Sequence, residues 1–253
     1  NKRICNSDNS LQKNGYEIFK KKIPINLLKT LNSFFNEKQK YNLDYFFEIL
    51  QFVDNNFSKK INEYFNDDII ICSASFLETK IEKSKDNISN SWHTDNLGHK
   101  INLLICVEGD GSQPTLFLSE SHKNLYKPKL FEEFRIFKKN ISHKKNSIHF
   151  KHQIGDCTLF DANGQHRGSY ENGSMTRRLM IIDFMKKSKF KDLSYNNLSL
   201  SNKKIKLPYR IEKKKIQPEN IIQKDVYEKL KKISFIDDEN FYLQNNDIYC
   251  LFI

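Results

Sequence analysis

Hydrophobic positions in the first quarter of the chain follow a helical period. Between residues 42 and 65, apolar side chains recur three and four residues apart, which places them on one helix face; they are Tyr45, Phe46, Ile49, Leu50, Val53, Phe57, Ile61 and Tyr64. A second apolar face follows Pro24, a residue that favours the first turn of a helix. The run at residues 15–20 is typical of a short strand. We therefore expect one strand and two helices before residue 68.

From about residue 69, short β-type runs replace the helical period. Gly-Asp and Asn-Gly pairs, which suit tight turns, separate several of them. Short strands joined in this way predict a jelly roll or a barrel. The fold class is therefore mainly β with flanking helices (α+β). The expected strands cover residues 69–82, 100–107, 114–118, 147–153, 157–161, 166–170 and 176–185.

We expect a single domain over residues 1–253. In it, residues 14–68 hold the N-terminal strand and helices, and residues 69–187 hold the core, with a helical insert near residues 124–140. Residues 188–253 form a Lys-rich C-terminal extension with one helix near residues 224–233. No apolar run reaches the ~20 residues of a membrane span, so we expect no membrane partner.

The formal net charge of +11 would suit a nucleic-acid partner. Only six of the 42 basic residues are arginines, however, and the lysines are spread along almost the whole chain. Because a diffuse lysine surface is usually only a solvated one, nucleic-acid binding is not favoured. The five cysteines are far apart and form no C-x-x-C pair, which fits free thiols in a reducing cytoplasm.

Two histidines and one aspartate are candidate metal ligands. One residue separates His93 from Asp95, and residues i and i+2 of an extended segment point to the same side. His166 begins a later strand. Two imidazoles and one carboxylate form the facial triad of non-haem Fe(II) oxygenases, which leaves coordination positions open for a cosubstrate and O2.

Arg177 lies eleven residues after His166. If residues 172–173 form a two-residue hairpin loop, Gly168 lies opposite Arg177, and the arginine points to the same side as His166. Arginine suits bidentate binding of a carboxylate. The spacing predicts that Arg177 binds the far end of a dicarboxylate that chelates the metal; a loop of odd length would give this role to Arg178.

These motifs together resemble the phytanoyl-CoA dioxygenase family of Fe(II)- and 2-oxoglutarate-dependent oxygenases. The resemblance covers residues 14–187 and rests on Trp92-His93-Thr94-Asp95, Ser119-Glu120-Ser121-His122-Lys123, Gly155-Asp156, His166 and Arg177. Ser119-Glu120 stands where the family usually has Pro-Gly. The resemblance implies a double-stranded β-helix (jelly-roll, cupin-like) core, iron bound by His93, Asp95 and His166, and 2-oxoglutarate bound by Arg177.

The resemblance also implies a dioxygenase that hydroxylates a small-molecule substrate, consumes O2 and releases succinate and CO2, with ascorbate as a candidate reductant. Asp95 favours hydroxylation, because related halogenases have a small residue in its place. Asn102 is a candidate cosubstrate contact, and the positive charge suggests an anionic substrate. Two alternatives stay open: a non-catalytic jelly-roll binding module, and a cupin-type metalloenzyme that does not use 2-oxoglutarate.

The other histidines are not expected among the ligands. His122 should hydrogen-bond the turn after a strand, and His99 faces either the substrate or solvent. His143, His149 and His152 lie in a Lys-rich stretch, so we expect them to be exposed.

Overall fold

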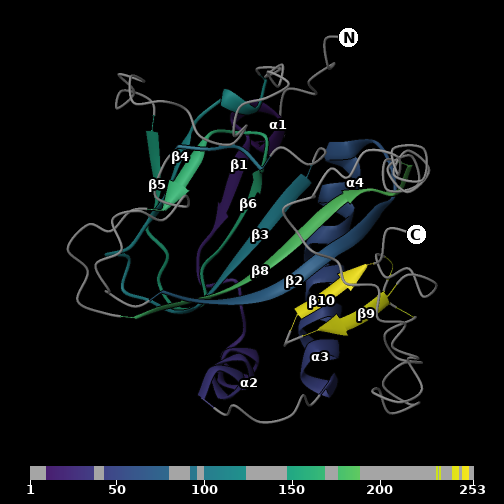
Figure 1. Cartoon of the computed structure of the whole chain (residues 1–253), viewed down its shortest axis with the longest axis vertical. Helices are drawn as coiled ribbons and strands as arrows, with labels where there is room; N and C mark the ends of the chain where they lie inside the picture. Colours follow the sequence, from purple (N-terminus) through teal and green to yellow (C-terminus); the bar gives the residue numbers. More distant parts are fainter. Residues whose placement is uncertain are drawn as a thin grey trace, which may run out of the picture. The chain divides into compact units, whose positions relative to one another are not determined.

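The described residues contain more strand than helix (Figure 1). The structure is a computed structural model, and it describes residues 10–36, 43–79, 92–95, 100–123, 147–168, 176–188, 232, 234, 241–244 and 247–250. The chain divides into two compact units, Asn1–Lys38 with Phe76–Ile182 and Gln39–Ser75 with Asp183–Ile253. The single domain expected over residues 1–253 stays a prediction.

The first unit contains two mostly antiparallel sheets. Within this unit the larger sheet has the strand order β1-β6-β3-β8-β2, and the smaller one has the order β5-β4-β7. The strands are β1 Tyr16–Phe19, β2 Ile69–Thr79, β3 Lys100–Glu108, β4 Thr115–Leu118, β5 Ser147–Phe150, β6 Cys157–Asp161, β7 His166–Gly168 and β8 Arg177–Lys186. The helices of this unit are α1 Ser10–Asn14, α2 Ile25–Asn36 and the short 3-10 helix η3 Ser121–Lys123.

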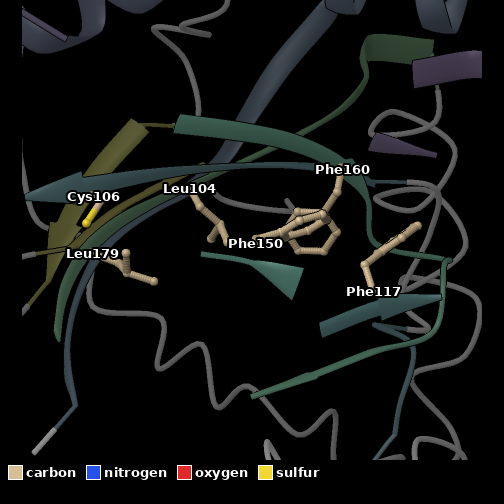
Figure 2. Packing of buried hydrophobic residues seen from close by; sticks show 6 residues of the cluster. All are labelled: Leu104, Cys106, Phe117, Phe150, Phe160 and Leu179. Carbon is tan, nitrogen blue, oxygen red and sulfur yellow. The ribbon is translucent and has the colours of Figure 1, made fainter. Parts of the chain in front are cut away.

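The two sheets of this unit meet in one aromatic core (Figure 2). The ring of Phe117 on β4 stacks on Phe150 of β5 with centroids 5.8 Å apart, and it meets Phe160 of β6 edge-on at 5.9 Å. Side chains from both sheets thus interdigitate, as they do in a jelly roll. The expected fold class, mainly β with flanking helices around a jelly-roll core, is confirmed. The buried cluster consists of Leu104, Cys106, Phe117, Phe150, Phe160 and Leu179.

The second unit combines helices with short strands. Its helices are α3 Leu43–Val53, the π-helix η1 Asp54–Ser58 and α4 Lys59–Phe65, and its further strands are β9 Phe241–Gln244 and β10 Asp247–Cys250. Within this unit the strand order is β8-β2-β10-β9. The expected helical region at residues 42–65 is confirmed, apart from the wider π turn of η1. In the described part of the chain, no helix is long and apolar enough to cross a membrane.

Sequence patterns predicted the strands of the core but not every element. Helix α1 and the β9–β10 hairpin were not expected. The helical insert near residues 124–140 lies outside the described residues. Of the helix expected at residues 224–233, only Lys232 is described, and it lies in a turn.

The expected hairpin between β7 and β8 is wrong. Gly168 of β7 pairs with Thr115 of β4, whereas β8 lies between β3 and β2 in the larger sheet. Turn-forming residues between two strands show that the chain reverses there. They do not show whether it returns to the same sheet or crosses to the facing one, as it does here.

Gly15 connects α1 to β1 in a conformation that favours glycine, with φ of +85°. A Cβ at this position would overlap the imidazole of His122, whose Cγ would be 2.9 Å away. The Nε2 atom of His122 is within 3.0 Å of the Gln12 backbone oxygen, so this histidine holds α1 against η3. The sequence analysis expected His122 to hydrogen-bond the turn after a strand; in the structure its Nε2 instead has the Gln12 backbone oxygen of α1 as a partner.

Gly15→Ala should lower the free energy of unfolding by about 3 kcal/mol, because it adds backbone strain and a clash with a buried ring. Urea unfolding measures this loss. Gly111→Ala is the matched control: φ is also positive there (+84°), but the nearest atom to its Cβ, the Cβ of Lys151, is 3.4 Å away. Equal losses in the two variants would contradict the clash with His122.

Candidate functional site

His93 and His166 face each other across two backbone hydrogen bonds. The N–H of His93 donates to the oxygen of His166 at 3.0 Å, and the N–H of His166 donates to the oxygen of His93 at 2.9 Å. Directly opposite residues of an antiparallel pair have their side chains on the same side. The two imidazole centroids therefore lie 4.4 Å apart.

Asp95 completes a group of three side chains, which we call the triad: His93, Asp95 and His166. The N–H of Asp95 donates to the backbone oxygen of Ala162 at 2.9 Å. Its carboxylate oxygens are 3.9 Å from Nε2 of His93 and 3.6 Å from Nε2 of His166. The ligand atoms of the triad all lie within 4.8 Å of one another, as binding of one metal ion requires. The structure thus brings the three predicted ligands together, within the first unit.

The orientation of His166 is fixed by the turn before it. Its Nδ1 lies 2.9 Å from the backbone oxygen of Gly164, so Nδ1–H donates to this oxygen and Nε2 is the ring nitrogen that faces Asp95. Metal-binding histidines usually have such a partner on the second ring nitrogen. Gly164 itself lies against the core, where a Cβ would overlap the ring of Phe117.

The charges of the triad favour an ionised aspartate. Burial alone would raise the pKa of the Asp95 carboxyl, but the hydrogen bond and charge of His166, with the charges of His93 and Lys100, hold it well below its usual range. Burial alone would lower the pKa of His166, and the bond to Asp95 outweighs this and raises it. Asp95 therefore offers the anionic oxygen that a cation binds.

The turn before η3 supports the His166 segment. The Oγ of Ser121 donates to the Leu118 backbone oxygen at 2.6 Å and accepts the N–H of Gln165 at 2.7 Å. Glu120 has φ of +66°, the left-handed conformation that glycine adopts most easily. Glu120 stands where the phytanoyl-CoA dioxygenase family, which the sequence motifs resemble, usually has glycine. It nevertheless adopts the backbone conformation that glycine favours.

Asn102 lies beside the triad, on β3. Its Nδ2 is 3.5 Å from the Asp95 carboxylate. Its Oδ1 is buried and has no hydrogen-bond partner among the described residues. An unpaired buried acceptor of this kind is costly unless a ligand or water donates to it.

Arg177 points into the core of the first unit. Its Nη1 donates to the backbone oxygen of Gln113 at 2.6 Å and contacts the Thr115 hydroxyl at 3.2 Å. Thr115 pairs directly with Phe150 of the aromatic cluster. Arg177 therefore reaches the same interior from the facing sheet, rather than from a strand next to β7 as the sequence had suggested.

Arg178, the next residue on β8, points away from Arg177 and is bound by other side chains of the protein. Its guanidinium contacts Glu78 at 2.9 Å and Glu108 at 3.1 Å, donates to Asn32 at 3.0 Å, and lies 5.3 Å from the ring centroid of Phe35. Two carboxylates already bind Arg178, so a cosubstrate carboxylate would have to displace them. This favours Arg177 over Arg178 as the anchor.

The strand register relates Arg177 to the triad. On β4, Phe117 pairs with His166, and Thr115, two residues earlier on the same face, contacts Arg177. On β6, Phe160 lies against His166 with ring centroids 5.1 Å apart, and Thr158 is two residues earlier. Two residues of a strand span ~7 Å. Thr115 and Thr158 thus lie about two strand residues from the level of His166, and Phe117 and Phe160 form the apolar layer on the His166 side.

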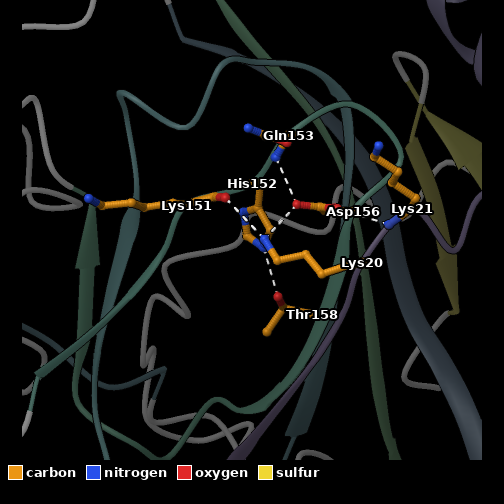
Figure 3. Close-up of polar contacts among 7 residues, drawn as sticks. All are labelled: Lys20, Lys21, Lys151, His152, Gln153, Asp156 and Thr158. Carbon is orange, nitrogen blue, oxygen red and sulfur yellow. Dashed lines mark hydrogen bonds and ion pairs between the residues drawn. The ribbon is translucent and has the colours of Figure 1, made fainter.

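His152 is a residue that the sequence analysis placed wrongly (Figure 3). It was expected to be exposed, but only 2% of its surface is accessible, and its Nε2 lies 2.7 Å from the Thr158 hydroxyl. The sequence does contain a pattern that indicates burial. Ile148, Phe150 and His152 are two residues apart, and the first two pack in the core. We call Arg177, Thr115, His152 and Thr158 together the arginine end of the core.

A buried carboxylate closes the turn beside His152 (Figure 3). Asp156 accepts hydrogen bonds from the Lys20 ammonium at 2.8 Å and from the backbone N–H groups of Lys21 and Gln153, both at 2.9 Å. Burial would raise the pKa of Asp156, and these bonds outweigh it and lower the pKa. The network fixes the Gly155-Asp156 turn that precedes β6.

Comparison with known proteins identifies the fold. No protein-family model matches the sequence, and no curated protein matches it. Among solved structures, the iron-bound HygX of Streptomyces hygroscopicus is 11% identical with a TM-score of 0.51, and the match covers 70% of this chain and 85% of that one. The structure of HygX with nickel, 2-oxoglutarate and hygromycin B is 10% identical with a TM-score of 0.50, and the match covers 70% of this chain and 85% of that one. ThoJ, described as a non-heme monooxygenase, is 12% identical with a TM-score of 0.50, and the match covers 70% of this chain and 75% of that one. At these identities the likeness shows the jelly-roll fold.

Arg178→Met should lower the free energy of unfolding by about 2 kcal/mol, because Glu78 and Glu108 lose a partner whose side chain is only 17% exposed. Urea unfolding of both forms measures the change. Lys123→Met is the control, because it breaks an exposed ion pair with Glu120 and should cost at most about 0.5 kcal/mol. Similar losses in both variants would contradict the structural role of Arg178.

Stability should fall as the pH is lowered below about 6.5, the ordinary pKa of histidine, and His152 contributes to this fall. Burial and the charge of Arg177 lower the pKa of His152 to about 3, with Asp156 opposing and Lys20 adding to the shift. The unfolded chain therefore binds this proton at a higher pH than the folded chain. In His152→Asn, the slope of unfolding free energy between about pH 4 and 6 should decrease by roughly 1 kcal/mol per pH unit. An unchanged slope in urea titrations would show that His152 does not stay neutral.

Proposed function

We propose that this chain is a non-haem Fe(II)- and 2-oxoglutarate-dependent dioxygenase that hydroxylates a small-molecule substrate. The observation that carries the proposal is the joint placement of the triad and Arg177 around one interior of a jelly-roll core. Membership of the phytanoyl-CoA dioxygenase family is part of the proposal and rests on the motifs of the sequence.

The triad has the donor set that Fe(II) requires. It supplies two imidazole nitrogens and one carboxylate, the set of facial-triad oxygenases. The Gly164 carbonyl holds the His166 tautomer that leaves Nε2 available, and the low pKa of Asp95 keeps its carboxylate ionised. His93, Asp95 and His166 would therefore hold the iron.

The remaining polar groups fit 2-oxoglutarate. Arg177, held by the Gln113 oxygen and Thr115, would bind the far carboxylate. Asn102, with its unpaired buried Oδ1 beside Asp95, would lie along the end of the cosubstrate that is nearest the metal. The apolar layer between them, with Leu104, Phe117 and Phe160, would surround the carbon chain and exclude water.

With iron and 2-oxoglutarate bound, O2 is reduced while 2-oxoglutarate loses CO2 to become succinate, and one oxygen atom enters a C–H bond of the substrate. The residues of the chain bind and orient these groups. Asp95 would fill a coordination position that would otherwise be open to another anion, which favours hydroxylation. An anionic substrate, ascorbate as a reductant and a cytoplasmic location, suggested by the free thiols of Cys106 and Cys157, belong to the same proposal.

The solved structures support the proposal through the groups that they contain. HygX has been solved with iron, and with nickel, 2-oxoglutarate and hygromycin B together. ThoJ is described as a non-heme monooxygenase. A chain that has this fold and the three ligand residues has the parts that such chemistry needs.

The decisive measurement is succinate formation from 2-oxoglutarate by anaerobically iron-loaded protein after O2 is admitted. Wild-type protein should form succinate that depends on Fe(II), while His93→Ala and Asp95→Ala should fall to background because the metal is lost. His149→Ala is the matched control, since this histidine lies on β5 with its neighbours Ile148 and Phe150 facing the core on the other side. It should keep wild-type activity.

Turnover can require the substrate, so binding is measured as well. Fe(II) together with 2-oxoglutarate should raise the melting temperature of the wild-type protein. The absence of both succinate and a thermal shift would contradict the oxygenase and favour a binding module. Metal-dependent activity that survives Arg177→Glu would instead favour a cupin-type enzyme without 2-oxoglutarate.

A further inference from the structure

One ring nitrogen at the arginine end lacks a hydrogen-bond partner within the described part of the chain. Nδ1 of His152 is buried and has no hydrogen-bond partner among the described residues. The whole residue is 2% exposed, so bulk water does not reach it. A buried polar atom left unpaired costs about 1–3 kcal/mol, which suggests that a ligand completes this site.

Thr158 determines which nitrogen of His152 carries the proton. Its hydroxyl, on a fully buried residue, has Nε2 of His152 as its hydrogen-bond partner at 2.7 Å. If Nε2–H donated, the hydroxyl hydrogen would need another acceptor, and the described residues offer none. The threonine therefore donates to Nε2, which leaves Nδ1–H as a buried donor.

This donor belongs to the surroundings of Arg177. Phe150 lies 6.0 Å from the His152 ring, centroid to centroid, and pairs with Thr115, which contacts Arg177. A Cβ on Gly109 would lie 3.5 Å from the His152 backbone oxygen and 3.7 Å from Cγ of Arg177. His152 and Arg177 therefore both lie beside Gly109.

The imidazole is also in the charge state that suits a donor beside an arginine. Burial and the charge of Arg177 lower the pKa of His152 to about 3, so the ring is neutral at physiological pH. A neutral donor adds a hydrogen bond to an anion without a second positive charge that would repel the guanidinium. Cys106 of the buried cluster is neutral too, because burial raises its pKa to about 12.

We propose that His152 is a binding residue for the far carboxylate of 2-oxoglutarate, to which it donates Nδ1–H beside Arg177 while Thr158 holds the tautomer. This inference rests on the proposed function, because it assigns a further contact for the same cosubstrate. Binding of the far carboxylate would then depend on the neutral Nδ1–H of His152 as well as on the positive charge of Arg177. A 2-oxo acid without the far carboxylate gains nothing from His152.

The test compares two ligands of the Mn(II)-loaded protein by calorimetry without O2: 2-oxoglutarate and 2-oxopentanoate, which has a methyl group in place of the far carboxylate. Wild-type protein should bind 2-oxoglutarate much more tightly. His152→Leu should weaken 2-oxoglutarate binding about ten- to a hundredfold and leave 2-oxopentanoate binding unchanged. His152→Asn, whose Nδ2 lies close to the position of Nδ1, should restore most of the loss, and Arg177→Met is the reference for losing the charge.

The outcomes separate the two proposals. If wild-type protein binds 2-oxoglutarate no better than 2-oxopentanoate, the proposed function fails. If the wild type discriminates but His152→Leu binds both ligands as the wild type does, or loses both equally, the role of His152 is overturned.

A measurement on wild-type protein covers the case in which His152→Leu does not fold. Nitrogen NMR of 15N-histidine-labelled protein with Zn(II) at the metal site should show a neutral His152 with the proton on Nδ1. That proton should shift when 2-oxoglutarate is added and stay in place when 2-oxopentanoate is added. Protonated Nε2, or equal responses to both ligands, would contradict the assignment.

Discussion

The two backbone hydrogen bonds between His93 and His166 are the constraint on which the site depends. They join segments far apart in the sequence and place both imidazoles on one side, and the extended backbone then brings Asp95 to the same side. A slip of one residue would turn these side chains to the opposite face. The same register pairs His166 with Phe117, so the triad and the aromatic core are positioned by one set of strand pairings.

Local periodicity was enough to predict much of this arrangement. The i, i+2 rule predicted that His93 and Asp95 share a side, and turn residues predicted the strands of the core. The inward direction of Arg177 was also expected, although from pairing with Gly168. In the structure Gly168 pairs with Thr115, and Arg177 contacts Thr115 from the facing sheet. Arg177 thus points into the core although the pairing from which this direction was derived does not occur, because the sequence pattern does not show which strand lies beside β8.

Other features depend on contacts that a sequence does not display. Strand β10 is short and pairs with β2 at Ser73 and Ala74, far away in the chain, so its own pattern is weak. His152 was misplaced because its lysine-rich neighbourhood outweighed the alternation with Phe150. Its burial follows from the partner Thr158, which lies across a turn. The roles of the triad and of Arg177 as ligands stay predictions until binding is measured.

The close approach of Gly164 and Phe117 has a consequence for how this protein can diverge. The carbonyl of Gly164 orients His166, while its missing side chain makes room for a core phenylalanine. A side chain at position 164 would overlap Phe117 and displace the carbonyl that orients His166, so substitution at these two positions is constrained by the candidate site as well as by folding. Substitutions would accumulate more easily elsewhere, at positions whose side chains touch neither the triad nor the Phe117 ring.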